Sequence, residues 1–267
     1  MSILSDRGPS MFEGSTVEQS LGTLASETEY EIVTTQANLP LSPLSFLQRM
    51  MAVTEIATIP LSAGSNVREP GSEATRIWQH MLATISQQDG CQKVYSGLQH
   101  EGPNTAQLFI VWDTLAHHEN FQTLPVYRQM LESLEPILGG SPQLVHFELE
   151  CPNDLAAAIC APVTELATLF LPGEMVSFDD NMNSFAAILT ERAEGFMGCT
   201  FSWIIEDVEH GSLGPGVKGK AYILAIGWSS ISAHAAFKQT SAFQKGLDLF
   251  KDALGSEIHH TTFWNTA

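Results

Sequence analysis

Apolar and other residues alternate along two short stretches of the chain, residues 52–61 and 162–171. A period of two predicts a β-strand at each place. An amphipathic helix is expected after each strand, because apolar residues then recur at helical spacing. A broken helix, 114–135 in the first half and 230–254 in the second, precedes the last strand of each half. The further predicted strands are 91–100, 105–113 and 142–150, and then 198–207, 219–228 and 256–265.

The two halves are copies of one unit. Val53–Leu61 reads VTEIATIPL and Val163–Leu171 reads VTELATLFL, so six of nine positions are identical. Further along, three residue types recur in the same order at an offset of 116, pairing Trp112 with Trp228, His118 with His234, and Phe121 with Phe237. Ordered matches over two segments of roughly 100 residues indicate an internal duplication.

Each copy has the order strand, helix, strand, strand, helix, strand, which is the ferredoxin-like unit βαββαβ of the α+β class. In such a unit the helices cover one face of the sheet. Two copies can cover each other's open faces, so we expect an α+β barrel closed within one chain, with the helices outside. The expected boundaries are 48–150 for the first repeat, 151–161 for a linker and 162–267 for the second repeat. Residues 1–47 are rich in Ser, Thr, Glu and Gln without a clear period, which predicts a mostly disordered leader.

The charge balance excludes several classes of partner. The 267 residues contain 12 Lys and Arg against 30 Asp and Glu, a formal net charge of −18. So few cations argue against binding to nucleic acid or to an anionic membrane surface. No apolar run approaches the roughly 20 residues of a membrane-spanning helix, and the N-terminus lacks the apolar core of a signal peptide. We expect a soluble, cytoplasmic protein with a small-molecule partner.

One segment resembles a known family. Trp112–Tyr127 reads WDTLAHHENFQTLPVY, in which a Trp ends a strand, a short helix carries His and Phe, and a Pro-x-Tyr segment starts the next helix. This is similar to the signature of antibiotic biosynthesis monooxygenase domains, which belong to the dimeric α+β barrel superfamily. The second copy keeps the Trp, His and Phe but has Ser241 and Phe243 in place of the Pro and Tyr. The opening Val-Thr-Glu strand resembles tandem members from filamentous fungi.

The resemblance implies a secondary-metabolism enzyme that holds an aromatic or polyketide-like molecule inside the barrel. It implies no cofactor: the substrate supplies electrons as an enolate or phenolate in a cofactor-free monooxygenation. A cyclase, pericyclase or decarboxylase would use the same pocket, and a ligand-binding barrel without catalysis is the non-enzymatic alternative. The non-enzymatic barrel would be favoured if the Glu and His side chains faced solvent and the barrel centre were packed. Because tandem copies remove the usual reason to dimerise, a monomer is expected, with a homodimer as the alternative.

Four residues are candidates for catalysis. Glu55 and Glu165 stand at equivalent places in otherwise apolar rows of the first strands. If that face lines the barrel, burial would raise their pKa values and suit them to proton transfer; otherwise a backbone N–H or an Arg satisfies them. His118 and His234 occupy equivalent places after the Trp, where they either act as acid or base or are structural residues that share ancestry.

Aromatic residues of the middle strands and following helices are candidate substrate contacts. They either line a pocket or fill the core beneath the helices. The set is Tyr95, Trp112, Phe121, Trp203, Tyr222, Trp228 and Phe237. Paired C-x-x-C or H-x-x-x-H spacing does not occur, so no metal is expected. Divergence between the copies favours one dominant cavity, to which the C-terminal repeat contributes more.

Removing residues 1–45 should leave the melting temperature within a few degrees of the full chain, because this segment has little apolar surface to bury. Thermal unfolding of the full and shortened chains checks this. A large loss of stability would instead mean that the leader packs as part of the fold.

Overall fold

The computed structural model describes residues 51–149 and 152–265, so the leader predicted at 1–47 lies outside the described residues. The first repeat contains β1 (Ala52–Pro60), α1 (Glu73–Ser86), β2 (Cys91–Gln99), β3 (Thr105–Trp112), α2 (Leu115–Thr123), α3 (Pro125–Leu134), η2 (Glu135–Ile137) and β4 (Gln143–Leu149). After α4 (Pro152–Ile159), the second contains β5 (Val163–Leu171), α5 (Val176–Arg192), β6 (Phe196–Trp203), β7 (Val208–Glu209), η3 (Gly211–Leu213), β8 (Lys218–Trp228), α6 (Ile231–Phe237), α7 (Ser241–Gly246), η4 (Leu247–Phe250) and β9 (Gly255–Asn265). In the described part of the chain, no helix is long and apolar enough to cross a membrane.

The strands of both repeats form one antiparallel sheet in the order β4-β1-β3-β2-β9-β5-β8-β6, with β7 paired to β8. β9 joins the repeats, because it pairs first with β5 and then with β2, up to the pairing of Tyr95 with Asn265. The two edges of the sheet meet where Phe147 of β4 forms a bridge with Ile204, which follows β6. The sheet therefore nearly closes on itself, and the α+β barrel of two ferredoxin-like repeats is confirmed.

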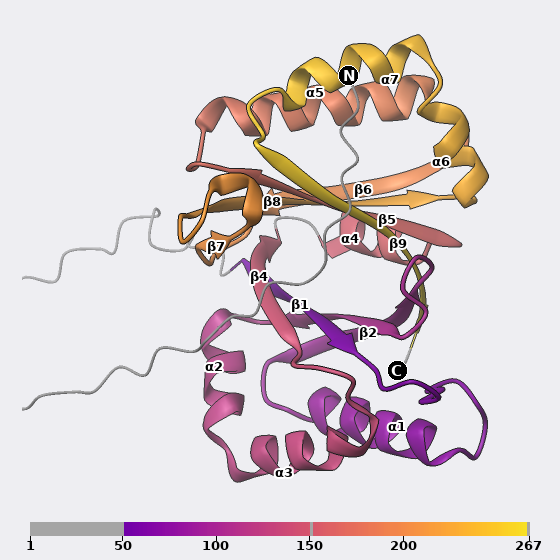
Figure 1. The fold of residues 1–267 in the computed structure, drawn as a ribbon, viewed down its shortest axis with the longest axis vertical. Coiled ribbons are helices and arrows are strands. Elements are labelled where there is room, and N and C mark those ends of the chain that lie inside the picture. The colour runs from indigo at the N-terminus through magenta and orange to yellow at the C-terminus, as the bar shows by residue number, and fades with distance from the viewer. Residues whose placement is uncertain (1–50, 150–151, 266–267) are drawn as a thin grey trace, which may run out of the picture. The chain divides into compact units, whose positions relative to one another are not determined.

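Two apolar cores lie between the sheet and its outer helices. Alternation along each strand sends one set of side chains toward the helices and the other set into the barrel. The largest buried side chains of the outer cores are Trp78, Trp112 and Phe121 in the first repeat, and Phe178, Tyr222 and Trp228 in the second. Figure 1 shows α1, α2 and α3 outside one half of the sheet and α5, α6 and α7 outside the other.

A third apolar core fills the barrel itself. Inward-facing residues of both halves, such as Phe109 and Phe170, pack in one cluster with Leu155 and Ile159 of α4. Figure 1 shows α4 between the two halves of the sheet. The segment predicted as a linker, 151–161, thus contains a helix that occupies the space in which the sequence predicted a ligand pocket.

Small residues let α4 approach the sheet closely. The hydroxyl of Thr164 on β5 donates to the carbonyl oxygen of Ala158 at 2.9 Å. Gly227 of β8 lies against the carbonyl groups of Ala157 and Ala158, where a side chain would have no room. The short run of Leu and Ala between the repeats therefore belongs to the core. From the sequence alone, a run of this length could not be told apart from a linker.

Substituting Gly227→Ala should lower the free energy of unfolding by about 1–3 kcal/mol, the usual cost of overpacking a core. The new Cβ would lie 2.8 Å from the Cβ of Ala161 and 2.9 Å from the carbonyl oxygen of Ala158. Gly140→Ala is the matched control, because its Cβ would meet only Pro60, at 3.5 Å. Denaturant unfolding measures both, and equal effects would contradict the close packing of α4 on the sheet.

Candidate active site

Glu55 lies on the outer face of β1, beneath the helices, and is buried. It pairs across the sheet with Ile110 of β3 and His146 of β4. The indole Nε1–H of Trp112 donates to Glu55 Oε2 at 2.9 Å. Burial raises the pKa of Glu55 from 4.5 to about 7, against the opposing effect of the Trp112 hydrogen bond. This carboxyl can therefore exchange a proton near neutral pH.

His118 of α2 lies directly over this carboxyl and is equally buried. Its ring stacks on Trp112 at a centroid distance of 5.3 Å and an angle of 15°. Its Nε2 lies 3.4 Å from Glu55 Oε2 and accepts from the side-chain amide of Gln122 at 3.2 Å. Burial lowers the pKa of His118 from 6.5 to about 4. The imidazole is therefore neutral at pH 7, and one of its two nitrogens carries a lone pair.

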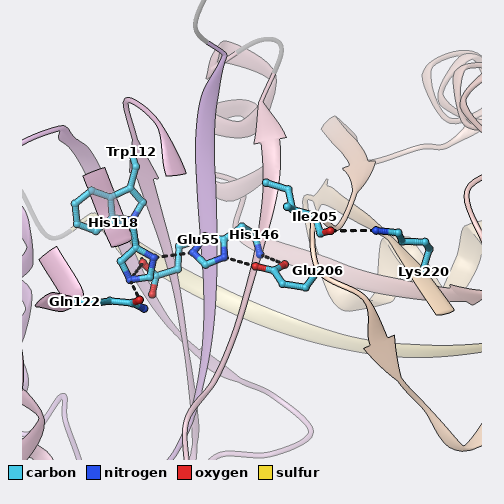
Figure 2. Close-up of polar contacts among 8 residues, drawn as sticks. All are labelled: Glu55, Trp112, His118, Gln122, His146, Ile205, Glu206 and Lys220. Carbon is cyan, nitrogen blue, oxygen red and sulfur yellow. Dashed lines mark hydrogen bonds and ion pairs between the residues drawn. The ribbon is translucent and has the colours of Figure 1, made fainter. Parts of the chain in front are cut away.

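The other ring nitrogen of His118 begins a chain of hydrogen bonds. His118 Nδ1 lies 2.7 Å from His146 Nε2, and His146 Nδ1 lies 2.5 Å from Glu206 Oε1. The backbone N–H of His146 donates to Glu206 Oε2 at 2.9 Å. Figure 2 shows this row of side chains, with Trp112 and Gln122 at the buried end and Lys220 beyond Glu206. We call Glu55, His118, His146 and Glu206 the first relay.

The partners fix the proton positions in the first relay. Burial works against ionisation of Glu206, but its hydrogen bonds from His146 outweigh this and lower the pKa of Glu206 below 4.5. A carboxylate only accepts, so His146 Nδ1 carries the hydrogen and His146 Nε2 accepts from His118 Nδ1. The lone pair of His118 is therefore on Nε2, which faces Glu55 and Gln122.

The second repeat contains the same arrangement. Trp228 Nε1–H donates to Glu165 Oε2 at 2.9 Å, and His234 Nε2 lies 3.3 Å from that oxygen. His234 Nδ1 lies 2.7 Å from His260 Nε2, and His260 Nδ1 lies 2.6 Å from Glu101 Oε1. Burial raises the pKa of Glu165 and lowers that of His234 to about 4. We call Glu165, His234, His260 and Glu101 the second relay.

Each relay begins in one repeat and ends in the other, because Glu206 follows β6 and Glu101 follows β2. The relays differ at one neighbour: the place of Gln122 is taken by Lys238 in the second copy. The charge of Lys238 acts to lower the pKa values of Glu165 and His234.

The four residues predicted for catalysis are thus brought together in two pairs, Glu55 with His118 and Glu165 with His234. They lie on the outer faces of the sheet, beneath the helices, and not inside the barrel. Of the predicted aromatic contacts, only one faces the barrel interior. Tyr95 lies in the inner core, Trp112 and Phe121 lie in the first outer core, and Trp203, Tyr222, Trp228 and Phe237 lie in the second. These last six lie beneath the outer helices and not in the barrel interior.

Sequence reasoning missed the ends of both relays. His146 and His260 each stand in the last strand of a copy, and Glu101 and Glu206 each follow the second strand. The signal that could have identified these residues is that both copies have a His in the last strand and a Glu after the second strand. Their offsets of 114 and 105 differ from the 116 of the Trp and His, so insertions in the loops obscured it.

Three groups of the first relay could hold a metal ion. Glu55, His118 and His146 can each offer one ligand atom, and these atoms lie within 4.8 Å of one another. Two imidazoles and a carboxylate suit several transition metals. The facing nitrogens of the two rings are 2.7 Å apart, whereas two nitrogens bound to one tetrahedral zinc lie about 3.3 Å apart. The geometry therefore fits direct sharing of a proton between the rings better than metal binding.

Comparison of the sequence with protein-family models and with curated proteins gives no match. Solved structures are similar in fold. An anthrone oxidase-like protein matches with a TM-score of 0.56 and 10% identity, over 80% of this chain and 92% of its own. Proteins provisionally named monooxygenases, from Lactobacillus acidophilus and Fusobacterium nucleatum, match with TM-scores of 0.50 at 8% identity, over 81% and 80% of this chain and 97% and 94% of theirs. Since these matches span both repeats, the chain has a tandem α+β barrel fold like that of these three proteins.

Proposed function

We propose that the protein is a cofactor-independent monooxygenase that removes a proton from an enolisable or phenolic aromatic substrate and lets the resulting anion react with dioxygen. The observation that carries this proposal is the buried, neutral His118, whose Nε2 lone pair lies beside Glu55 and accepts from Gln122. His234 repeats it beside Glu165. The names of the similar folds, monooxygenase and anthrone oxidase-like, support the same class of reaction.

In this proposal the substrate binds between the sheet and the outer helices. The barrel interior is filled by α4, whereas the reactive nitrogen lies under α2. Since His118 is almost fully buried, α2 must move outward for the substrate to enter, and Gln122 gives up its hydrogen bond to His118 Nε2. Tyr127 of α3 packs on Phe121 at a centroid distance of 5.0 Å and would form the adjoining wall.

The reaction then needs no electron from the protein. A C–H or O–H proton of the substrate passes to His118 Nε2, and the electron pair stays on the substrate as an enolate or phenolate. The anion transfers one electron to dioxygen, and the two radicals combine into a peroxide anion at carbon. A proton returned by His118 or by water converts this anion into the hydroperoxide. Loss of water from a CH₂ centre gives a ketone, so that one dioxygen is consumed and one water is released. The buried site strengthens each hydrogen bond to the developing charge.

We expect His118→Gln and His234→Gln together to lower turnover about 100-fold or more, because both bases are lost. The assay supplies anthrones and naphthols to the purified protein and measures dioxygen uptake together with product. The control is His80→Gln, an exposed residue of α1. Product without dioxygen uptake would favour a cyclase or decarboxylase, and unchanged turnover in the double variant would exclude the histidines as bases.

A second prediction concerns Glu55 and pH. Its pKa is raised from 4.5 to about 7 on folding, so the folded state binds its proton more tightly. The stability that this group contributes is present below pH 4.5 and is lost as the pH rises through 7. Relative to Glu55→Gln, the wild type should lose about 3 kcal/mol of unfolding free energy across this window.

Denaturant unfolding at a series of pH values measures this difference. The exposed Glu132 of α3 provides the control, Glu132→Gln, which should follow the wild type at every pH. A constant difference between wild type and Glu55→Gln from pH 4 to 8 would mean that Glu55 is an ordinary ionised carboxylate.

A further inference from the structure

We infer that each relay is a proton exit path that crosses from one repeat to the other, so that each catalytic histidine depends on a glutamate supplied by the opposite repeat. Glu206 serves His118, and Glu101 serves His234. This rests on the proposed function, in which His118 and His234 receive the substrate proton. Glu206 and Glu101 are positioning and proton-releasing groups and do not touch the substrate.

The exposure of the side chains rises steadily along each relay. In the first relay, the exposed fraction is 2% for His118, 9% for His146 and 37% for Glu206. In the second, it is 6% for His234, 12% for His260 and 49% for Glu101. Each relay therefore runs from a site closed to water to a carboxylate that water reaches. This gradient occurs in both copies, although their surrounding residues differ.

The hydrogen bonds permit transfer without any large movement. When His118 Nε2 takes a proton, the Nδ1 proton of His118 can pass to His146 Nε2. The Nδ1 proton of His146 then passes to Glu206, which releases it to water. His118 is left with its hydrogen on Nε2, and His146 with its hydrogen on Nε2. Rotation of the rings or return of a proton from water restores the starting tautomers, and no electrons or other atoms are exchanged.

The contacts that close the barrel also fix the last group of each relay. Ile205 N–H donates to the carbonyl oxygen of His146 at 2.8 Å, next to the hydrogen bond from His146 N–H to Glu206. Lys220 Nζ donates to the carbonyl oxygen of Ile205 at 3.1 Å and pairs with Asp207 at 3.0 Å, which holds this turn (Figure 2).

The junction of β2 with β9, in the middle of the strand order, repeats this design. His100 N–H donates to the carbonyl oxygen of His260 at 2.8 Å, and His260 N–H donates to Glu101 Oε2 at 2.8 Å. At each junction, the backbone N–H of one residue, Ile205 or His100, pairs with the opposite repeat. The next residue is a glutamate, and it binds a histidine of that opposite repeat. Without the opposite repeat, neither histidine pair would have its terminal carboxylate.

The test uses the full chain labelled with ¹⁵N and the variants Glu206→Gln and Glu101→Gln. Glu148→Gln, on the same strand as His146 and exposed, is the control for loss of charge. Imidazole nitrogen shifts report the tautomers of His118 and His146, and exchange of the His118 Nδ1 proton with water reports the exit path. Neither readout requires turnover, so they test the relay even if the proposed reaction is wrong.

We expect Glu206→Gln to disturb the tautomers of His118 and His146 and to slow exchange of the His118 Nδ1 proton about tenfold or more, with His234 and His260 unchanged. Glu101→Gln should give the reverse pattern, and it tests the second relay if Glu206→Gln does not fold. With an active substrate, each variant should lower kcat more than it changes KM, and Glu206→Asp should restore part of the loss. Unchanged exchange, or equal effects on both relays, would overturn the inference.

Discussion

Backbone pairing between the two repeats is the constraint on which the rest of the structure depends. β9 passes from β5 of its own repeat to β2 of the other, and the turn after β6 pairs with β4. These junctions remove the open sheet edges that each repeat would present alone. They also bring Glu206 to His146 and Glu101 to His260. Closure of the barrel and completion of the two relays are therefore one structural event.

The barrel provides the support on which the relays are built. Its interior is packed by apolar strand residues and by α4, whereas the titratable groups lie on the outer faces under the helices. A carboxyl and an imidazole at such depth lose their charges unless partners stabilise them. The replacement of Gln122 by Lys238 and of Tyr127 by Phe243 changes the polarity around the second relay. Two sites of one design thereby differ in their polar surroundings.

The duplication and nearly every strand followed from the sequence, because period-two alternation and repeated residues are local signals. The burial of Glu55 was also foreseeable, since it stands in an apolar row, whereas the place of His118 was left open between an acid or base and a structural residue. Alternation cannot tell which face of a strand meets the helices, so the sequence left the aromatic residues open between a pocket lining and the core beneath the helices. The role of α4 was missed because a short run of Leu and Ala reads equally as a connection or as core. The relay ends were missed because only barrel closure brings Glu206 beside His146.

The central claim is that His118 and His146 share a proton chain that ends on the carboxylate of Glu206. A neutron crystal structure of the full chain near pH 7 tests this most directly, because it locates the hydrogen atoms. The proposed relay requires a deuteron on Nδ1 of both imidazoles, none on His118 Nε2, and an ionised Glu206, with the same pattern from His234 to Glu101. A metal ion bound between Glu55, His118 and His146, or a His146 ring turned away from Glu206, would contradict it.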